Sequence, residues 1–128
     1  MGHFHVTARL TGPTGSSEDL PLFVDTGSTL IVLPRSVAER LGLQPLGTYP
    51  VELAGGVVDA WPVADIRVGL QGREAPTLCF ISDRGEPLLG VVALETLFLA
   101  VDPVGRRLVP TKAFAMPSVP RRAAAVSA

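Results

Sequence analysis

Residues 22–28 constrain the fold of this chain more than any other stretch. They read Leu-Phe-Val-Asp-Thr-Gly-Ser, so an apolar strand runs directly into an aspartate and a short polar turn. Aspartate is seldom buried without a partner, so an aspartate carried on a core strand needs hydrogen-bond donors close by. The turn supplies such donors. The sequence therefore predicts one carboxylate, Asp25, held by a tight turn at the end of a buried strand.

Alternation of apolar and polar residues with a period of two dominates the rest of the chain. Such alternation is typical of half-buried β-strands. It predicts strands at residues 4–10, 20–24, 30–33, 51–54, 57–60 with a continuation through 66–68, 75–82, 99–101 and 107–109. Two short helices are expected, one at residues 35–41 between a proline and a glycine and one at residues 91–97. The fold class predicted from these patterns is all-β with two short helices.

Glycine and proline mark the expected connections. Residues 11–19 are rich in Gly, Pro, Ser and Asp and are predicted to form a loop. Gly55-Gly56 separates two apolar runs and predicts a β-hairpin with a two-residue turn, since both glycines can adopt positive φ. Pro62 implies an edge position or a bulge in the return strand. Order fades near the C-terminus, so we expect one domain at residues 1–112 and a flexible tail at residues 113–128.

The composition narrows the classes of partner. Of the 128 residues 47% are hydrophobic and 18% are charged, with a mean hydropathy of +0.38, which points to a compact β core or to surface hidden in an oligomer. The net charge is −1 and no basic face is visible, so nucleic acid is not an expected partner. The sequence shows neither a membrane-spanning run nor a signal-peptide pattern, so no membrane partner and a cytoplasmic location are expected. The lone Cys79 lies in an apolar run and is predicted to be a small buried hydrophobe.

The chemistry of Asp25 depends on a second carboxylate. Hydrolysis of a peptide without a metal or a nucleophilic side chain needs a base that activates water and an acid that polarises the carbonyl. Two carboxyl groups about 3 Å apart do both, because they share one proton. Other aspartates of the chain, among them Asp59, Asp65, Asp83 and Asp102, lack the Thr-Gly context of Asp25. A two-fold symmetric dimer, which places Asp25 of each chain at the axis, is the most economical way to obtain the pair.

Three features in sequence order resemble one protein family. Residues 23–28 are similar to the catalytic loop of retropepsin-like (clan AA) single-lobe aspartic proteases, Gly55-Gly56 falls at the position of their flap, and the Pro-Leu-Leu-Gly of residues 87–90 is similar to their second apolar-glycine signature. The resemblance implies a closed β-barrel or sandwich with a flap hairpin, acting as a homodimer. It also implies an aspartic endopeptidase that acts on peptide or protein substrates and needs neither a metal nor another cofactor.

The resemblance implies roles for individual residues. Asp25 would be the catalytic carboxylate, Thr26 would hydrogen-bond across the dimer axis, and Gly27 would let the substrate backbone approach. Hydrogen-bond donation from Ser28 favours the ionised carboxylate and predicts a more acidic working range. The expected substrate-binding residues are Ser28, the flap tip Gly55, Gly56 and Val57, and Leu88, which would line a subsite for apolar side chains.

Two positions depart from the retroviral pattern. Thr29 stands where retroviral members usually have an acidic residue, and Val91-Val92 stands where they have a basic residue followed by Asn or Asp. Both partners of one ion pair are thus absent together. The departure favours the cellular or prokaryotic type within the family.

Other interpretations of the same residues stay open at this point. Asp25 could be a structural turn residue that accepts hydrogen bonds from the amides of Gly27 or Ser28. Gly55-Gly56 could be only a hairpin turn. His3 and His5 alternate with core residues and are expected to be solvated, with a metal site as the alternative. Trp61 is expected in the core or at an interface, with contact to substrate as the alternative.

The alternative function is a catalytically silent module that keeps the retropepsin fold. Its groove and hairpin would bind an extended peptide by strand addition, or support dimerisation, without cleavage. A third hypothesis is a chain that stays monomeric and inactive until a partner assembles it.

Overall fold

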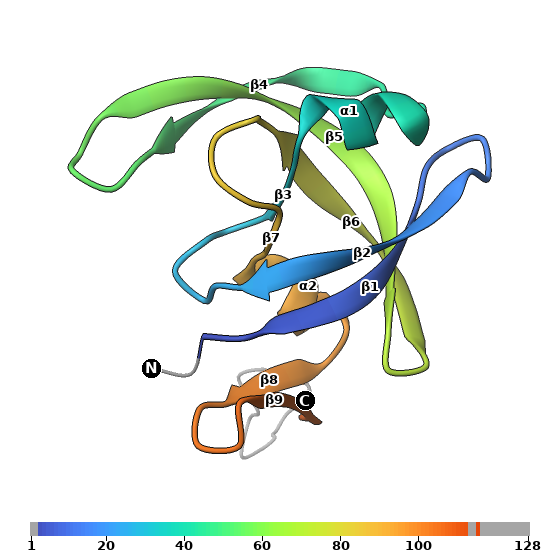
Figure 1. Ribbon diagram of the computed structural model, residues 1–128, viewed down its shortest axis with the longest axis vertical. Coiled ribbons are helices and arrows are strands. Elements are labelled where there is room, and N and C mark those ends of the chain that lie inside the picture. Colours follow the sequence, from blue (N-terminus) through green and yellow to red (C-terminus); the bar gives the residue numbers. More distant parts are fainter. Residues whose placement is uncertain (1–2, 113–114, 116–128) are drawn as a thin grey trace, which may run out of the picture.

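The computed structural model describes residues 3–112 and residue 115 (Figure 1). Apart from residue 115, the expected tail at residues 113–128 lies outside the described residues. The elements in chain order are β1 (His5–Thr11), β2 (Ser17–Val24), β3 (Ile31–Leu33), α1 (Arg35–Arg40), β4 (Pro45–Glu52), β5 (Val58–Leu70), β6 (Arg73–Ile81), β7 (Leu88–Leu89), α2 (Val91–Thr96), β8 (Leu99–Asp102) and β9 (Arg107–Pro110). The prediction of a mostly-β fold with two short helices is confirmed.

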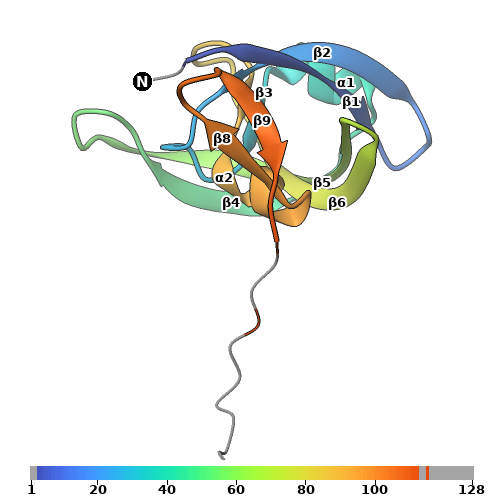
Figure 2. The same cartoon turned by 90° about the horizontal axis from the view of Figure 1, so that it is seen from below.

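Seven strands share one sheet. Their order is β1-β2-β7-β3-β6-β5-β4, and β1 also pairs with β5. The short strand β7 lies between β2, to which it is parallel, and β3, to which it is antiparallel. Strands β8 and β9 form a separate sheet that lies with α2 at one end of the molecule (Figure 1), and the view from that end shows them in front of the larger sheet (Figure 2). The placement of β7 brings residues 88–89 directly beside the end of β2, where Asp25 follows.

The core is built from the inward faces of these strands. Alternation along β1 is as expected, since Ala8 and Leu10 have no exposed surface while His5, Thr7 and Arg9 are exposed. Buried residues of both sheets and both helices belong to one hydrophobic cluster. No polar or charged residue among the described ones is fully buried. Apolar burial is therefore the main force that fixes the strands carrying the aspartate.

The predicted loop at residues 11–19 is wrong in extent. β1 continues to Thr11 and β2 begins at Ser17, so only residues 12–16 connect the strands. The polar residues at the start of β2 face outward and contact β1. The hydroxyl of Ser17 lies 2.8 Å from that of Thr11, and Arg9 donates to Asp19 at 2.9 Å. A polar composition is thus found on an exposed strand face as well as in a loop, and it does not distinguish the two.

The hairpin between β4 and β5 corrects a second prediction. Both Gly55 and Gly56 have positive φ, at 93° and 86°, as expected. The turn nevertheless has three residues rather than two, because the amide of Leu53 donates to Val57 O at 2.7 Å. Strand β4 also begins at Pro45, six residues before the predicted strand.

The edge position predicted from Pro62 is confirmed. Pro62 faces Thr48 of β4, and the pairing of β5 with β6 begins only at Val63. No residue of β6 is therefore paired with Pro62, and the lack of an amide proton in proline breaks no hydrogen bond to β6. Residues 58–62 pair only with β4, so this part of the sheet is a two-stranded arm.

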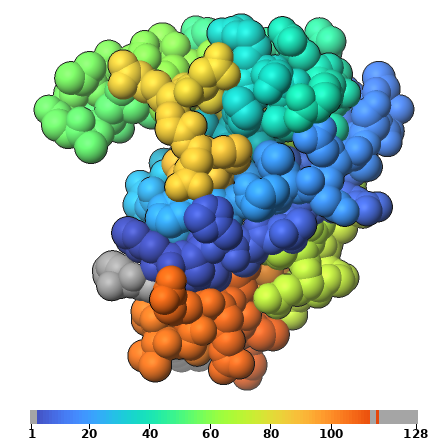
Figure 3. All heavy atoms as spheres, in the orientation of Figure 1, coloured from blue at the N-terminus to red at the C-terminus, as the bar shows by residue number. Residues whose placement is uncertain are grey.

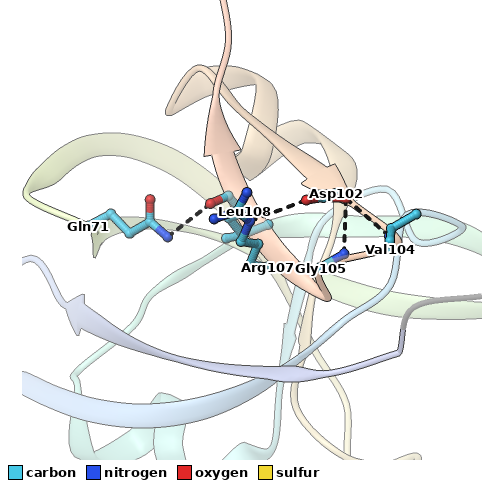
Figure 4. A network of polar contacts seen from close by, with 6 residues as sticks. All are labelled: Gln71, Asp102, Val104, Gly105, Arg107 and Leu108. Carbon is cyan, nitrogen blue, oxygen red and sulfur yellow. Dashed lines mark hydrogen bonds and ion pairs between the residues drawn. The ribbon is translucent and has the colours of Figure 1, made fainter.

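The C-terminal hairpin is held by the polar network in Figure 4. The carboxylate of Asp102 accepts hydrogen bonds from the amide of Gly105 at 3.1 Å and from Arg107 Nε at 3.2 Å. These two donors keep the pKa of Asp102 below its usual value. Gln71, in the turn between β5 and β6, donates to Leu108 O at 3.3 Å. The expected hairpin over residues 99–109 is thus present and is joined to the larger sheet.

Burial of Cys79 gives a simple prediction. Cys79 has no exposed surface, and burial raises the pKa of its thiol to about 12 from an ordinary 9.0. We expect no alkylation of the native protein by iodoacetamide at about pH 8 and stoichiometric alkylation in urea. Because the unfolded thiol ionises first, the free energy of unfolding should fall as the pH rises above 9.0. Rapid alkylation of the native protein would contradict the buried position.

Candidate active site

Asp25 stands at the end of β2, where a turn supplies donors to both of its carboxylate oxygens. Its amide donates to Leu89 O of β7 at 3.1 Å, which ties the residue to the core. Oδ1 accepts from the amide of Gly27 at 2.9 Å, and Oδ2 accepts from the hydroxyl of Ser28 at 3.3 Å. The side chain is half-buried in the single chain. The Asp25 carboxylate therefore accepts the hydrogen bond from the Gly27 amide that a structural turn aspartate would accept. The same carboxylate is still partly exposed to solvent.

The start of α2 braces this turn from behind. The amide of Val91 donates to Ser28 O at 2.8 Å, and the amide of Val92 donates to Thr29 O at 3.0 Å. Gly90 lies so close that a Cβ atom there would be 2.7 Å from Ser28 O. The two segments that lack the retroviral acid and base are thus joined here through their backbones. The pattern at residues 87–90 marked this segment in the sequence, but the reason for its glycine is visible only in three dimensions.

A cavity of about 920 Å³ lies between the aspartate turn and the β4–β5 hairpin. Figure 3 shows the green hairpin overhanging an open space above the light-blue turn region, with the yellow segment that follows β6 nearby. The lining combines the turn, the hairpin and strands β3, β5, β6 and β7. The lining residues are Asp25, Gly27, Ser28, Thr29, Leu30, Val32, Tyr49, Pro50, Val51, Glu52, Leu53, Ala54, Trp61, Val63, Leu78, Phe80 and Leu88.

Most of the site residues expected in the aspartate turn and in β7 meet at this cavity. Asp25, Gly27, Ser28 and Leu88 line it. Thr26 does not line it, and its exposed hydroxyl makes no hydrogen bond with any described residue. Thr26 therefore projects from the turn toward solvent.

The expected flap residues are placed differently. Gly55, Gly56 and Val57 lie at the exposed end of the β4–β5 hairpin and do not line the cavity. Leu53 and Ala54, which directly precede these three residues, do line it. The strands of the hairpin thus cover the cavity, whereas its tip extends beyond the cavity of the single chain.

Aromatic residues are the part of the cavity that the sequence interpretation missed. Tyr49 and Trp61 face each other across β4 and β5, and Phe80 lies next to Trp61. Trp61 is half-buried on the cavity wall rather than fully buried in the core. No local signal could have found the pair, because the expected two-residue turn at Gly55-Gly56 would place Tyr49 opposite Pro62, whereas the observed three-residue turn places it opposite Trp61.

The histidines are exposed, as expected. His5 Nε2 lies 2.7 Å from Glu86 Oε1, and the rings of His3 and His5 stand edge-on to Phe23. Within residues 3–112 and residue 115, no group of three His, Cys, Asp or Glu residues is arranged to hold a metal ion. In the same part of the chain, no helix has both the length and the apolar character needed to cross a membrane.

Comparison with known proteins gives one family match and several structural ones. A family model described as aspartyl protease matches residues 6–92. The EIAV protease complexed with the inhibitor HBY-793 is 18% identical, with a TM-score of 0.60 over 73% of this chain and 86% of that chain. A retropepsin-like aspartic protease from Rickettsia conorii is 24% identical, with a TM-score of 0.55 over 78% of this chain and 76% of that chain.

The simian foamy virus (mac) protease is similar as well. It is 20% identical, with a TM-score of 0.52 over 72% of this chain and 92% of that chain. No curated protein sequence is significantly similar to this chain. At these identities the structural matches show the fold, which is the mostly-β retropepsin-like fold with two short helices.

Proposed function

This chain belongs to the retropepsin-like aspartyl protease family, and we propose that it is an aspartic endopeptidase assembled as a symmetric homodimer. The observation that carries the proposal is the position of Asp25. Its carboxylate is held by donors on both oxygens, remains half-buried, and lines a cavity large enough for several side chains of a peptide. Peptides are the substrate class that the family implies.

The proposed reaction uses one Asp25 from each chain. Two carboxyl groups that share one proton give a base and an acid in the same place. The ionised carboxylate takes a proton from a water molecule, which attacks the peptide carbonyl, while the protonated partner donates to the carbonyl oxygen. The tetrahedral intermediate then collapses with protonation of the leaving amine. No covalent bond forms between enzyme and substrate.

The homodimer is proposed because one chain supplies only half of this pair. Asp-Thr-Gly occurs once in the sequence. Thr26 is exposed next to Asp25 and its hydroxyl has no partner among the described residues, so it is free to bond to its counterpart across an axis. The closed barrel implied by the resemblance belongs to the same proposal, and the pairing of β1 with both β2 and β5 supports it.

The β4–β5 hairpin is proposed as the flap. A Cβ atom added at Gly55 or Gly56 would meet nothing within 4 Å, and Val57 is 61% exposed. The tip is therefore free of packing that would hold it open, and its stem already covers the cavity. Closure over a bound peptide would exclude water and position the scissile bond.

Digestion of a peptide library at acidic pH tests the proposal. We expect internal cleavage between apolar residues, and loss of cleavage when a peptide with a non-hydrolysable hydroxyethylene isostere is added. Tight binding of the isostere without any turnover would instead support the catalytically silent peptide-binding module. A cytoplasmic location stays a prediction from the sequence.

Sedimentation over a range of protein concentrations tests the dimer separately. Activity per chain should rise with the dimer fraction, because each site needs two chains. A chain that stays monomeric at every concentration, yet gains activity when another protein is added, would support the hypothesis of assembly by a partner.

A further inference from the structure

Three aromatic side chains form one wall of the cavity, opposite the aspartate turn. This aromatic wall consists of Tyr49 on β4, Trp61 on β5 and Phe80 on β6, and all three line the cavity together with Asp25. Tyr49 and Trp61 are direct cross-strand partners. The ring centroids of Trp61 and Phe80 are 5.8 Å apart, with the planes at 80°. The rings of Trp61 and Phe80 therefore pack against each other, and Tyr49 adjoins Trp61 across the β4–β5 pair.

The indole of Trp61 is fixed by polar groups outside the cavity. Its Nε1 donates to Asp59 Oδ2 at 3.0 Å, and Asp59 Oδ1 accepts from the amide of Ala60 at 2.9 Å. Arg84 Nε lies 3.9 Å from Asp59 Oδ2 and comes from the segment between β6 and β7. The polar edge of the indole is thus satisfied by the protein. A ligand meets its apolar surface without having to supply a hydrogen bond.

Part of the aromatic wall is left uncovered by the chain itself. Tyr49 is 58% exposed although it lines the cavity, while Trp61 and Phe80 are half-buried. We propose that the aromatic wall is a specificity subsite that binds an aromatic side chain of the peptide substrate, and that Asp59 is the residue that positions Trp61 in it. The proposal deepens the endopeptidase assignment and rests on it.

The surroundings favour an aromatic side chain over a charged one. Rings gain from edge-to-face contact beyond the area they bury. The neighbouring lining residues Leu78, Val63 and Val32 are apolar. Glu52 also borders the cavity, but in the β4–β5 register it alternates with Val51 and so belongs to the face opposite Tyr49 and Trp61. The carboxylate of Asp59 is already engaged by Trp61 and the Ala60 amide, so a cation at the wall would meet ring faces but no free carboxylate of the wall.

The single tryptophan of the chain provides a direct test by fluorescence. The Asp25→Asn protein is titrated with short peptides that share one apolar pair and carry Phe, Leu, Lys or Glu at each flanking position in turn. At one position the Phe peptide should bind about 3- to 10-fold more tightly than the Leu peptide and should change the emission of Trp61. Binding is read here without any cleavage.

Variants of the active protein test which residues carry the preference. Trp61→Leu and Tyr49→Leu should each reduce the preference for Phe over Leu in kcat/KM to about 2-fold or less, chiefly through KM. Asp59→Ala should reduce it as well, whereas Asp59→Asn should retain it, because the amide oxygen still accepts the indole N–H. Leu46→Ala is the matched control, since Leu46 is 63% exposed on the same β4 strand and lies outside the cavity.

The outcomes separate this inference from the proposed function. Cleavage without an aromatic preference and without a change in Trp61 emission would overturn the subsite and leave the endopeptidase. Aromatic-selective binding with no cleavage by the unaltered protein would keep the subsite and overturn the endopeptidase. Tighter binding of the Lys peptide than of the Phe peptide, or equal loss of preference in Asp59→Asn and Asp59→Ala, would also contradict the proposal.

Discussion

Asp25→Asn is expected to abolish peptide cleavage while the protein stays folded. The substitution removes both the base and the acid from a symmetric site, because each dimer loses two carboxyl groups at once. General acid–base catalysis by one such group contributes about 10²- to 10⁴-fold, so kcat should fall by at least about 10⁴-fold. The measurement is peptide cleavage at the pH of maximal activity, together with the urea unfolding curve of the same preparation.

The fold should survive because asparagine can keep the turn. Its amide oxygen accepts the Gly27 amide that now bonds to Asp25 Oδ1 at 2.9 Å, and its NH₂ group can donate to the Ser28 hydroxyl. Asp65→Asn is the matched control, since Asp65 is exposed on β5 and makes no hydrogen bond or ion pair with any described residue through its side chain. Residual cleavage by Asp25→Asn above the background of buffer would refute the catalytic role of this aspartate.

The aspartate turn was predictable because its signal is local. Asp25, Gly27 and Ser28 are close in sequence, and hydrogen bonds to a carboxylate from the amide two residues later and the hydroxyl three residues later need no tertiary information. The same holds for helix α1, which begins after Pro34 and is followed by Gly42 at a φ of 67°. Interactions between residues close in sequence determine both the aspartate turn and helix α1, so both could be predicted from the sequence.

The cavity walls were not predictable from local patterns. Trp61 lies on the wall because it belongs to the first part of β5, which precedes the pairing with β6 and pairs only with β4. That outcome depends on the register of a hairpin whose turn has three residues instead of the expected two. A change of one residue in a turn changes which side chains oppose each other across the whole arm. The sequence therefore predicted that a hairpin would cover the site, but not which side chains it would contribute.

The early start of β4 has a similar cause. Residues 45–50 contain two prolines and a glycine and are exposed along their whole length, so they lack the alternation that marks a strand. They pair with β5 despite a register irregularity between Pro45 and Gly47. Tertiary pairing with a long partner strand here overrides weak local preference. Tyr49, the exposed member of the cross-strand aromatic pair, lies in this segment and was missed for that reason.

Gly90→Ala is the second substitution with a large expected effect, and it acts on the aspartate turn from outside the cavity. A Cβ atom at this position would lie 2.6 Å from Leu30 O and 2.7 Å from Ser28 O, both backbone atoms that cannot rotate away. The φ of Gly90 is −96°, which any residue adopts, so the effect is steric rather than conformational. The turn and the start of α2 must move apart, which weakens the hydrogen bonds from the amides of Val91 and Val92. Overpacking of this kind costs about 1–3 kcal/mol in the free energy of unfolding.

The displaced turn carries Asp25, so Gly90→Ala should cost activity beyond its cost in stability. A shift of about 1 Å in a reacting group lowers the rate by about 100-fold. We expect kcat/KM to fall by at least that factor at a temperature where the variant is fully folded by circular dichroism. Gly47→Ala provides the control, because a Cβ atom at Gly47 would meet nothing within 4 Å and its φ is not positive. Equal stability and activity in Gly90→Ala and the unaltered protein would show that the turn is not braced by α2. A loss of stability with unchanged kcat/KM would show that the bracing does not set the position of the carboxylate.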